Sequence, residues 1–214
     1  MGNSRKQGRA IGPPHGIFPS QVNSNQPQPV RDDSTLRGAM LESTRVYQGG
    51  YLSVDRLRYA AIPLPVVREV VRVRSGVCVL GVGRDGMVSL VRQFRQAIDL
   101  VILELPAGVR DPGESALDAA RRELSEEVGL VEGEWTHLRH YAHAEGYSDG
   151  WMDLYLAVDC DQAENHPDPG EELELVRVPV DEFYAMLDNG GFVDAKTILA
   201  AIQSRQILTQ RWCS

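Results

Sequence analysis

Three glutamates lie close together in residues 114–128, a segment whose composition favours a helix. Glu123 and Glu127 are four residues apart, so their side chains project from one helix face about one turn apart, and Glu126 flanks that face. Like charges this close destabilise a helix whose role is only structural. Clustered carboxylate oxygens are, however, what Mg²⁺ or Mn²⁺ prefers in proteins. Such a cluster can hold a divalent cation, which would attract the phosphates of a substrate.

Arg122 lies four residues before Glu126, where it can offset part of the repulsion and orient a carboxylate through paired hydrogen bonds. Taken alone, these residues fit a solvated acidic helix face better than a metal site. The wider pattern reverses that interpretation. It reads Gly108, five residues, Glu114, seven residues, Arg122-Glu123-Leu124, one residue, Glu126-Glu127, one residue, Gly129-Leu130.

This segment resembles the signature of the Nudix hydrolase family, GX5EX7REUXEEXGU with U an aliphatic residue, and every fixed position is present. A complete match of this length, placed between a strand and a helix, rarely arises by chance. Gly108 allows a sharp turn after the strand and a close approach of the backbone to the site. The resemblance implies that Arg122 positions Glu126 for catalysis. It also implies that the divalent metal, Mg²⁺ or Mn²⁺, is held by Glu123, Glu126, Glu127 and the backbone carbonyl of Ala107.

Further motifs are similar to those of the Nudix subgroup that acts on ADP-ribose and other nucleoside diphosphate sugars. Residues 92–95 read RQFR, residues 104–108 ELPAG, residues 146–149 GYSD and residues 194–197 DAKT. The alternative for the two arginines is surface charge at a strand end, and for Glu104 an ion pair or a metal contact. The resemblance implies substrate binding by Arg92, Arg95, Glu104, Ser148 and Asp149.

Two departures from the subgroup pattern keep the substrate open. ADP-ribose-specific members usually carry a proline where this chain has residues 143–145, and Gly150 replaces an acidic residue. GDP-mannose or another nucleoside diphosphate-linked compound is therefore the alternative substrate. The subgroup often draws its general base from a late acidic loop, here Glu171 or Glu172. The alternative is that this loop is only a solvated acidic segment.

The resemblance implies an enzyme that hydrolyses the pyrophosphate bond of a nucleoside diphosphate sugar to a nucleoside monophosphate and a sugar phosphate. A non-catalytic or catalytically weak Nudix module that binds a nucleotide metabolite is the rival, although such modules usually lose glutamates that are kept here. Members of the subgroup are commonly homodimers in which the N-terminal sheet helps build the partner's pocket. We therefore expect a homodimer.

The elements that must position these residues give an α+β pattern. Alternating and β-branched residues predict strands, and Asp85-Gly86 between two apolar runs predicts a hairpin. We expect a Nudix fold, a mixed sheet between helices, preceded by a small antiparallel sheet. The predicted organisation is a flexible tail over residues 1–40, a sheet subdomain over 41–74 and a Nudix domain over 75–210. The predicted strands are 45–51, 52–61, 66–74, 76–82, 87–93, 101–105, 135–143, 152–158 and 173–180, and the predicted helices 114–128, 181–187 and 195–205.

The composition restricts the partners. The net charge of −8 argues against nucleic-acid binding, which usually needs a basic face. No apolar run reaches the roughly 18 residues of a membrane-spanning helix. The first 12 residues are polar and basic, unlike a secretory signal. Three widely spaced cysteines predict free thiols in a reducing compartment. We therefore expect a cytoplasmic protein with a small-molecule substrate.

Overall fold

The computed structural model describes residues 38–61, 63–166 and 172–212, and residues 39–214 group into one compact unit. The predicted tail lies almost wholly outside the described residues, so that prediction stays open. Within the described part of the chain, none of the helices has the length and apolar content needed to traverse a bilayer.

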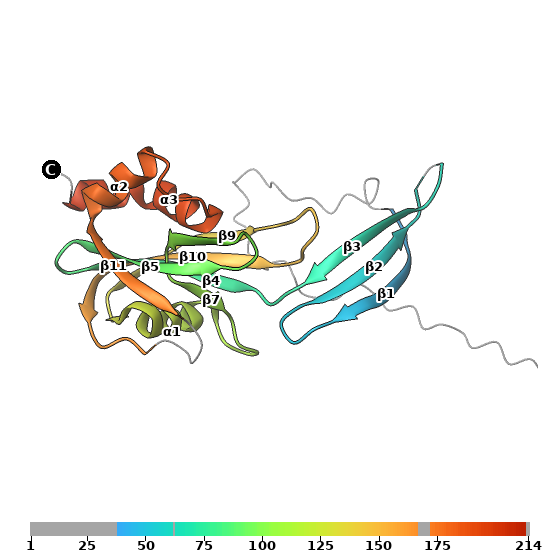
Figure 1. Ribbon diagram of the computed structural model, residues 1–214, viewed down its shortest axis with the longest axis horizontal. Helices are drawn as coiled ribbons and strands as arrows, with labels where there is room; N and C mark the ends of the chain where they lie inside the picture. The colour runs from blue at the N-terminus through green and yellow to red at the C-terminus, as the bar shows by residue number, and fades with distance from the viewer. Residues whose placement is uncertain (1–37, 62, 167–171, 213–214) are drawn as a thin grey trace, which may run out of the picture. The chain divides into compact units, whose positions relative to one another are not determined.

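The predicted N-terminal sheet is confirmed. It consists of β1 (Met40–Gln48), β2 (Ser53–Tyr59) and β3 (Val66–Arg72), paired antiparallel in that order (Figure 1). The first strand begins five residues earlier than predicted, because Met40 and Glu42 pair with Tyr59 and Arg58 across a bulge. Every residue of β1 is exposed. A sheet with so little burial gains little hydrophobic stabilisation of its own.

The larger sheet is mixed, as expected for the predicted fold. Its path runs β11-β5-β4-β10-β8, with β6, β7 and β9 paired at its sides. β4 and β10 are parallel and the other pairs are antiparallel. Neither β7 nor β8 was anticipated as a strand, because runs of two and three residues carry no readable alternation. The strands are β4 (Gly76–Gly83), β5 (Met87–Arg95), β6 (Leu100–Glu104), β7 (Ala107–Val109), β8 (Leu130–Val131), β9 (Glu134–Ala142), β10 (Trp151–Gln162) and β11 (Leu173–Pro179).

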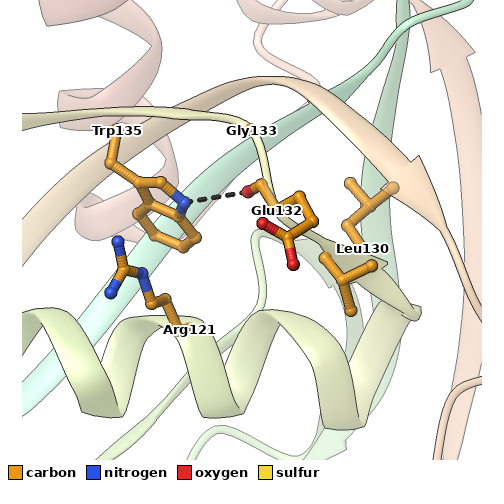
Figure 2. Close-up of a pocket in the computed structure, with 6 residues that line it drawn as sticks. Arg121, Leu130, Glu132, Gly133 and Trp135 are labelled. Atoms are coloured by element: carbon orange, nitrogen blue, oxygen red, sulfur yellow. Dashed lines mark hydrogen bonds between the residues drawn. The ribbon is translucent and has the colours of Figure 1, made fainter.

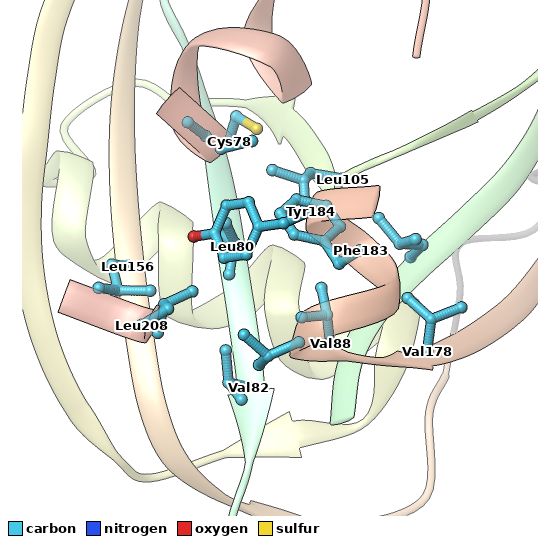
Figure 3. Close-up of a cluster of buried hydrophobic side chains, with 14 of the residues drawn as sticks. Cys78, Leu80, Val82, Val88, Leu105, Leu156, Val178, Phe183, Tyr184 and Leu208 are labelled. Carbon is cyan, nitrogen blue, oxygen red and sulfur yellow. The ribbon is translucent and has the colours of Figure 1, made fainter. Parts of the chain in front are cut away.

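Helices cover both faces of this sheet: α1 (Ala116–Val128), α2 (Val180–Asp188) and α3 (Ala195–Trp212). β4 is buried throughout, and its alternate side chains enter two different cores. One face carries Leu80 and Val82 into a cluster with Phe183 of α2 and Leu208 of α3 (Figure 3). The other carries Val77 and Val79 into a cluster with Ala119, Ala120, Leu124 and Val128 of α1. The predicted arrangement of a mixed sheet between helices is therefore confirmed.

The ends of α1 are fixed by local chemistry. The Ser115 side chain accepts a hydrogen bond from the Asp118 amide and caps the helix start. Gly129 ends the helix in the left-handed conformation, with φ of 67°. Helical residues therefore begin at Ala116, and Glu114 lies outside the helix. Its carboxylate instead bonds back to the loop by accepting from the Asp111 amide (3.0 Å).

Candidate functional site

Position 108 requires glycine because the Glu123 side chain lies against its backbone. β7 pairs antiparallel with β4 and leads through residues 110–115 into α1, which brings Gly108 under Glu123. A Cβ added to Gly108 would lie 2.0 Å from a carboxylate oxygen of Glu123. No side chain fits in that space, so the glycine allows the backbone and the carboxylate to meet.

Arg122 holds the acidic residues of the motif together. Its guanidinium donates to Glu123 (Nη1–Oε1, 2.8 Å) and Glu126 (Nη1–Oε2, 3.1 Å). It also donates to both carboxylate oxygens of Glu114 and to the Val109 carbonyl, each at 3.1 Å. Hydrogen bonds from Arg122 are the largest cause that lowers the pKa of Glu114, and the acidic partners raise the pKa of Arg122. The predicted contact with Glu126 is therefore present, as part of a wider network.

Glu127 faces the strand that precedes the helix. Its Oε2 accepts from the Ala107 amide (3.1 Å), and the residue is only 4% exposed. The backbone carbonyls of Glu126 and Glu127 accept from the His166 amide (2.9 Å) and the Asn165 side chain (3.2 Å). The start of the late acidic loop is thus tied to the same helical turn as the glutamates.

The donor set fits a hard divalent cation. It is made of carboxylate oxygens packed against a glycine whose Cβ space is filled by Glu123. Among the residues described by the structure, no three acidic, histidine or cysteine side chains converge as ligands of one ion. Arg122 instead binds the oxygens of Glu123 and Glu126. A cation must therefore compete with Arg122 for those oxygens.

A cavity of about 850 Å³ lies beside the motif. Its lining includes Gly108, Arg122 and Glu123, together with Arg95 and Lys196 from β5 and α3. Its other walls carry Tyr51, His143, Tyr147 and Ser148. The volume falls within the range of small-molecule sites, and cations, carboxylates and aromatic rings share one space. These groups suit a ligand that has both anionic and ring-shaped parts.

Glu104 is fully buried between two cations. Its Oε1 accepts from Arg95 Nε (2.7 Å), and its Oε2 accepts from Lys196 Nζ. Lys196 also donates to Asp194 (2.9 Å). Burial acts to lower the pKa of Lys196, but Asp194 and Glu104 outweigh it, so the net shift is upward. The ion pair named as the alternative for Glu104 is therefore present, and substrate binding by Glu104 stays a prediction. No residue of the DAKT segment was predicted to lie in the site. The motif was nevertheless the signal in the sequence that could have identified Lys196.

The structure does not gather every predicted residue at this cavity. Arg92 pairs with Glu174 (2.7 Å), and both line a separate cavity of about 520 Å³ together with Glu172. Glu171 lies outside the described residues. Asp149 is not among the described residues that line the large cavity, because its carboxylate turns towards β3.

A third cavity, of about 320 Å³, lies at Trp135 and Arg121 (Figure 2). The Trp135 indole donates to the Glu132 carbonyl (2.9 Å), and the Arg121 guanidinium lies 5.7 Å from the ring centroid. Glu123 lines the 850 Å³ cavity but is not among the described residues that line this one, and Glu126 and Glu127 are among those of neither cavity. Because it borders the motif through Gly108, Arg122 and Glu123, the 850 Å³ cavity is the candidate site.

Known proteins resemble this chain in sequence and in fold. A family model for the NUDIX domain matches residues 72–201. The chain is 30% identical over 135 residues to ADP-ribose pyrophosphatase of Bacillus subtilis (strain 168), covering 62% of this chain and 73% of that protein. It is 30% identical over 135 residues to ADP compounds hydrolase NudE of Escherichia coli (strain K12), covering 63% and 72%. A solved structure titled "Crystal structure of ADP compounds hydrolase" matches with a TM-score of 0.73 at 26% identity, covering 82% of this chain and 96% of that one.

Proposed function

Because the chain belongs to the Nudix family, we propose that it hydrolyses the pyrophosphate bond of a nucleoside diphosphate sugar, ADP-ribose or a related compound. The products are a nucleoside monophosphate and a sugar phosphate. The observation that carries this proposal is the acidic network around Arg122 at the edge of a cavity that also holds Arg95 and Lys196. The names of the two relatives support the substrate class.

The metal proposed is Mg²⁺, with Mn²⁺ as a substitute. Glu123, Glu126 and Glu127 would hold it with the backbone carbonyl of Ala107, since these are hard oxygen donors on adjacent elements. Bound there, a divalent ion would lower the pKa of a coordinated water and neutralise negative charge on the phosphates. The protein's own part is to hold the carboxylates in place, and Arg122 does this through its hydrogen bonds to Glu123 and Glu126.

The other proposed roles follow from the cavity. Arg95 and Lys196 line it and present positive charge to the phosphates, while buried Glu104 keeps both side chains in position. Ser148 also lines this cavity and is a further candidate for substrate contact. Arg92 stays a candidate for substrate binding because it lines the neighbouring cavity together with Glu172. The proton of the attacking water would pass to Glu171 or Glu172 as general base. The anchoring of Asn165 and His166 on α1, at the start of that loop, supports this choice.

The direct test is hydrolysis of a substrate panel by the purified chain with Mg²⁺. The panel contains ADP-ribose, GDP-mannose and a nucleoside triphosphate as control, with products separated by anion-exchange chromatography. We expect a nucleoside monophosphate and a sugar phosphate from at least one nucleotide sugar. Tight binding without turnover would instead support the rival reading, a module that binds a nucleotide metabolite.

GDP-mannose stays the second candidate substrate because of the residues at one wall of the cavity. A Cβ added to Gly150 would lie 2.2 Å from His143 Nε2 and 2.7 Å from a Val73 methyl group. The acidic side chain that many subgroup members carry at this position therefore does not fit here. The larger kcat/KM in the panel decides between ADP-ribose and GDP-mannose.

We further propose a homodimer, because β1 leaves large apolar side chains in water. Met40, Leu41, Val46 and Tyr47 are 43–56% exposed. Light scattering during size-exclusion chromatography measures the mass directly, and a monomer of 23.7 kDa would contradict this proposal. We also propose a cytoplasmic location, in keeping with the free thiols of Cys78 and Cys160.

A further inference from the structure

Residues 147–149 run alongside the end of β3 as a short added strand. The Val71 amide donates to the Tyr147 carbonyl (2.7 Å), and the Asp149 amide donates to the Val71 carbonyl (3.2 Å). Val71 and Ser148 form an isolated parallel bridge. These bonds join a loop of the larger sheet to a strand of the small one, so the position of the loop depends on β3.

The Asp149 side chain completes this junction. Its Oδ1 accepts from the Val73 amide (3.1 Å), and its Oδ2 accepts from Arg72 Nη1 (3.0 Å). Both carboxylate oxygens are therefore engaged by β3 and the residue that follows it. A carboxylate held by an amide and a guanidinium has a fixed orientation.

Arg72 is itself fixed from the other side. Its Nε donates to Asp55 Oδ2 (2.9 Å), and Arg45 donates to the other oxygen of Asp55. Hydrogen bonding by Arg45 is the largest cause that lowers the pKa of Asp55, with Arg72 adding to it against the effect of burial. Alternating charges thus cross the three strands from Arg45 to Asp149. Each charged side chain is oriented by its neighbour in this series. The position of the loop therefore depends on the pairing of the three strands.

The loop that this network holds forms a wall of the candidate cavity. His143, Tyr147 and Ser148 line the cavity, and Tyr147 is 61% exposed. The Ser148 hydroxyl accepts from the Gly150 amide (3.1 Å), and the Tyr147 and Ser148 amides donate to the Ala144 carbonyl. Local bonds shape the turn, and the contacts with β3 fix it against the rest of the site.

We propose that Asp149 is a positioning residue, which holds the Tyr147–Ser148 wall in place through Arg72 and β3 and thereby sets affinity for the substrate. The proposal rests on the proposed function for the identity of that substrate. It differs from the sequence-based expectation that Asp149 contacts substrate directly. Glu123, Glu126 and Glu127 lie on α1, whereas the hydrogen bonds of Asp149 and Arg72 join them to each other, to β2 and to the end of β3. Loss of the network should therefore weaken binding and leave the bond-breaking step nearly unchanged.

The kinetic test compares Asp149→Asn, Arg72→Gln and the double variant with the best nucleotide sugar of the panel. Each single variant should raise KM by about threefold to tenfold and change kcat by less than about twofold. The double variant should be no worse than the more severe single variant, because both break one connection. Asp149→Glu should recover part of the lost affinity.

The matched control is Arg56→Gln on the same sheet. Arg56 pairs with Glu69 at 2.9 Å, and both side chains are more than half exposed. This variant removes one positive charge from the sheet, as Arg72→Gln does, without changing a contact of the loop. KM should stay at the wild-type value. A raised KM in Asp149→Asn with a normal KM in Arg72→Gln would mean direct substrate contact and overturn the proposal. A fall in kcat alone would overturn it as well.

Hydrogen exchange gives a readout that needs no activity. The Val71, Val73 and Asp149 amides should exchange faster in Asp149→Asn and Arg72→Gln than in wild type or Arg56→Gln, at a temperature where all four stay folded. Unchanged exchange would overturn the positioning role. If the wild type hydrolyses no nucleotide sugar while exchange rises as expected, the proposed function fails and the network stands.

Discussion

Replacing Gly108 with alanine tests how closely the backbone must approach the carboxylates that are proposed to bind the metal. The new Cβ would lie 2.0 Å from the Glu123 carboxylate, so that group must retreat by about 1.4 Å to reach ordinary van der Waals contact at 3.4 Å. Glu123 is largely buried and bonded to Arg122 at 2.8 Å, so the movement also breaks that bond. The substitution therefore moves one carboxylate by about 1.4 Å and removes one hydrogen bond.

Activity and stability should respond to very different degrees. A shift of about 1 Å in a catalytic constellation can cost about 100-fold in rate, so kcat/KM should fall by roughly that factor. A hydrogen bond between charged groups is worth about 1.5–3 kcal/mol, which lowers Tm by about 3–12 °C in a domain of this size. The measurements are steady-state hydrolysis of ADP-ribose with Mg²⁺, calorimetric titration with Mn²⁺ and thermal unfolding.

Two further variants separate the effect of the Gly108–Glu123 contact from a general effect of replacing a glycine. Gly50→Ala is the control, because nothing lies within 4 Å of a Cβ at Gly50. Glu123→Asp shortens the side chain and makes room, so Gly108→Ala should add little further loss in that background. Near wild-type activity and Mn²⁺ affinity in Gly108→Ala would refute the reasoning, because the carboxylate position would then not matter.

Three more outcomes follow from single contacts. Glu127→Gln keeps an oxygen for the Ala107 amide but removes a charge, so kcat should fall by about 100-fold or more with Tm unchanged, and a fully active variant would contradict the proposed mechanism. Thr197→Val leaves the buried Leu105 amide without its acceptor (2.9 Å), so urea unfolding should show a loss of about 1–3 kcal/mol that Thr197→Ser does not share. Because the pKa of Glu114 is lowered, its carboxylate stabilises the fold above the ordinary pKa of about 4.3, and this contribution disappears as pH falls through the folded-state pKa. Wild type should therefore be more stable than Glu114→Gln at pH 6, and the two should converge at low pH.

Local patterns in the sequence determined most of the elements. The run from Ala116 to Val128 has helix formers, a serine before it and a glycine after it, and the helix ends there. Asp85-Gly86 lies in the hairpin between β4 and β5, with φ of 75° at Gly86. The strand at residues 107–109 escaped prediction, because its pairing with β4 is long-range and three residues show no period.

The sequence by itself also determined that Glu123 and Glu127 share one helix face, since their spacing of four residues is about one helical turn. Tertiary structure decided which distant groups share the site with it. Lys196 meets Glu104 only because α3 packs on the sheet, and Asp149 is turned towards β3 only because residues 147–149 pair with Val71. A side chain's neighbours along a helix follow from covalent geometry, whereas its partners from other elements depend on how the whole chain packs.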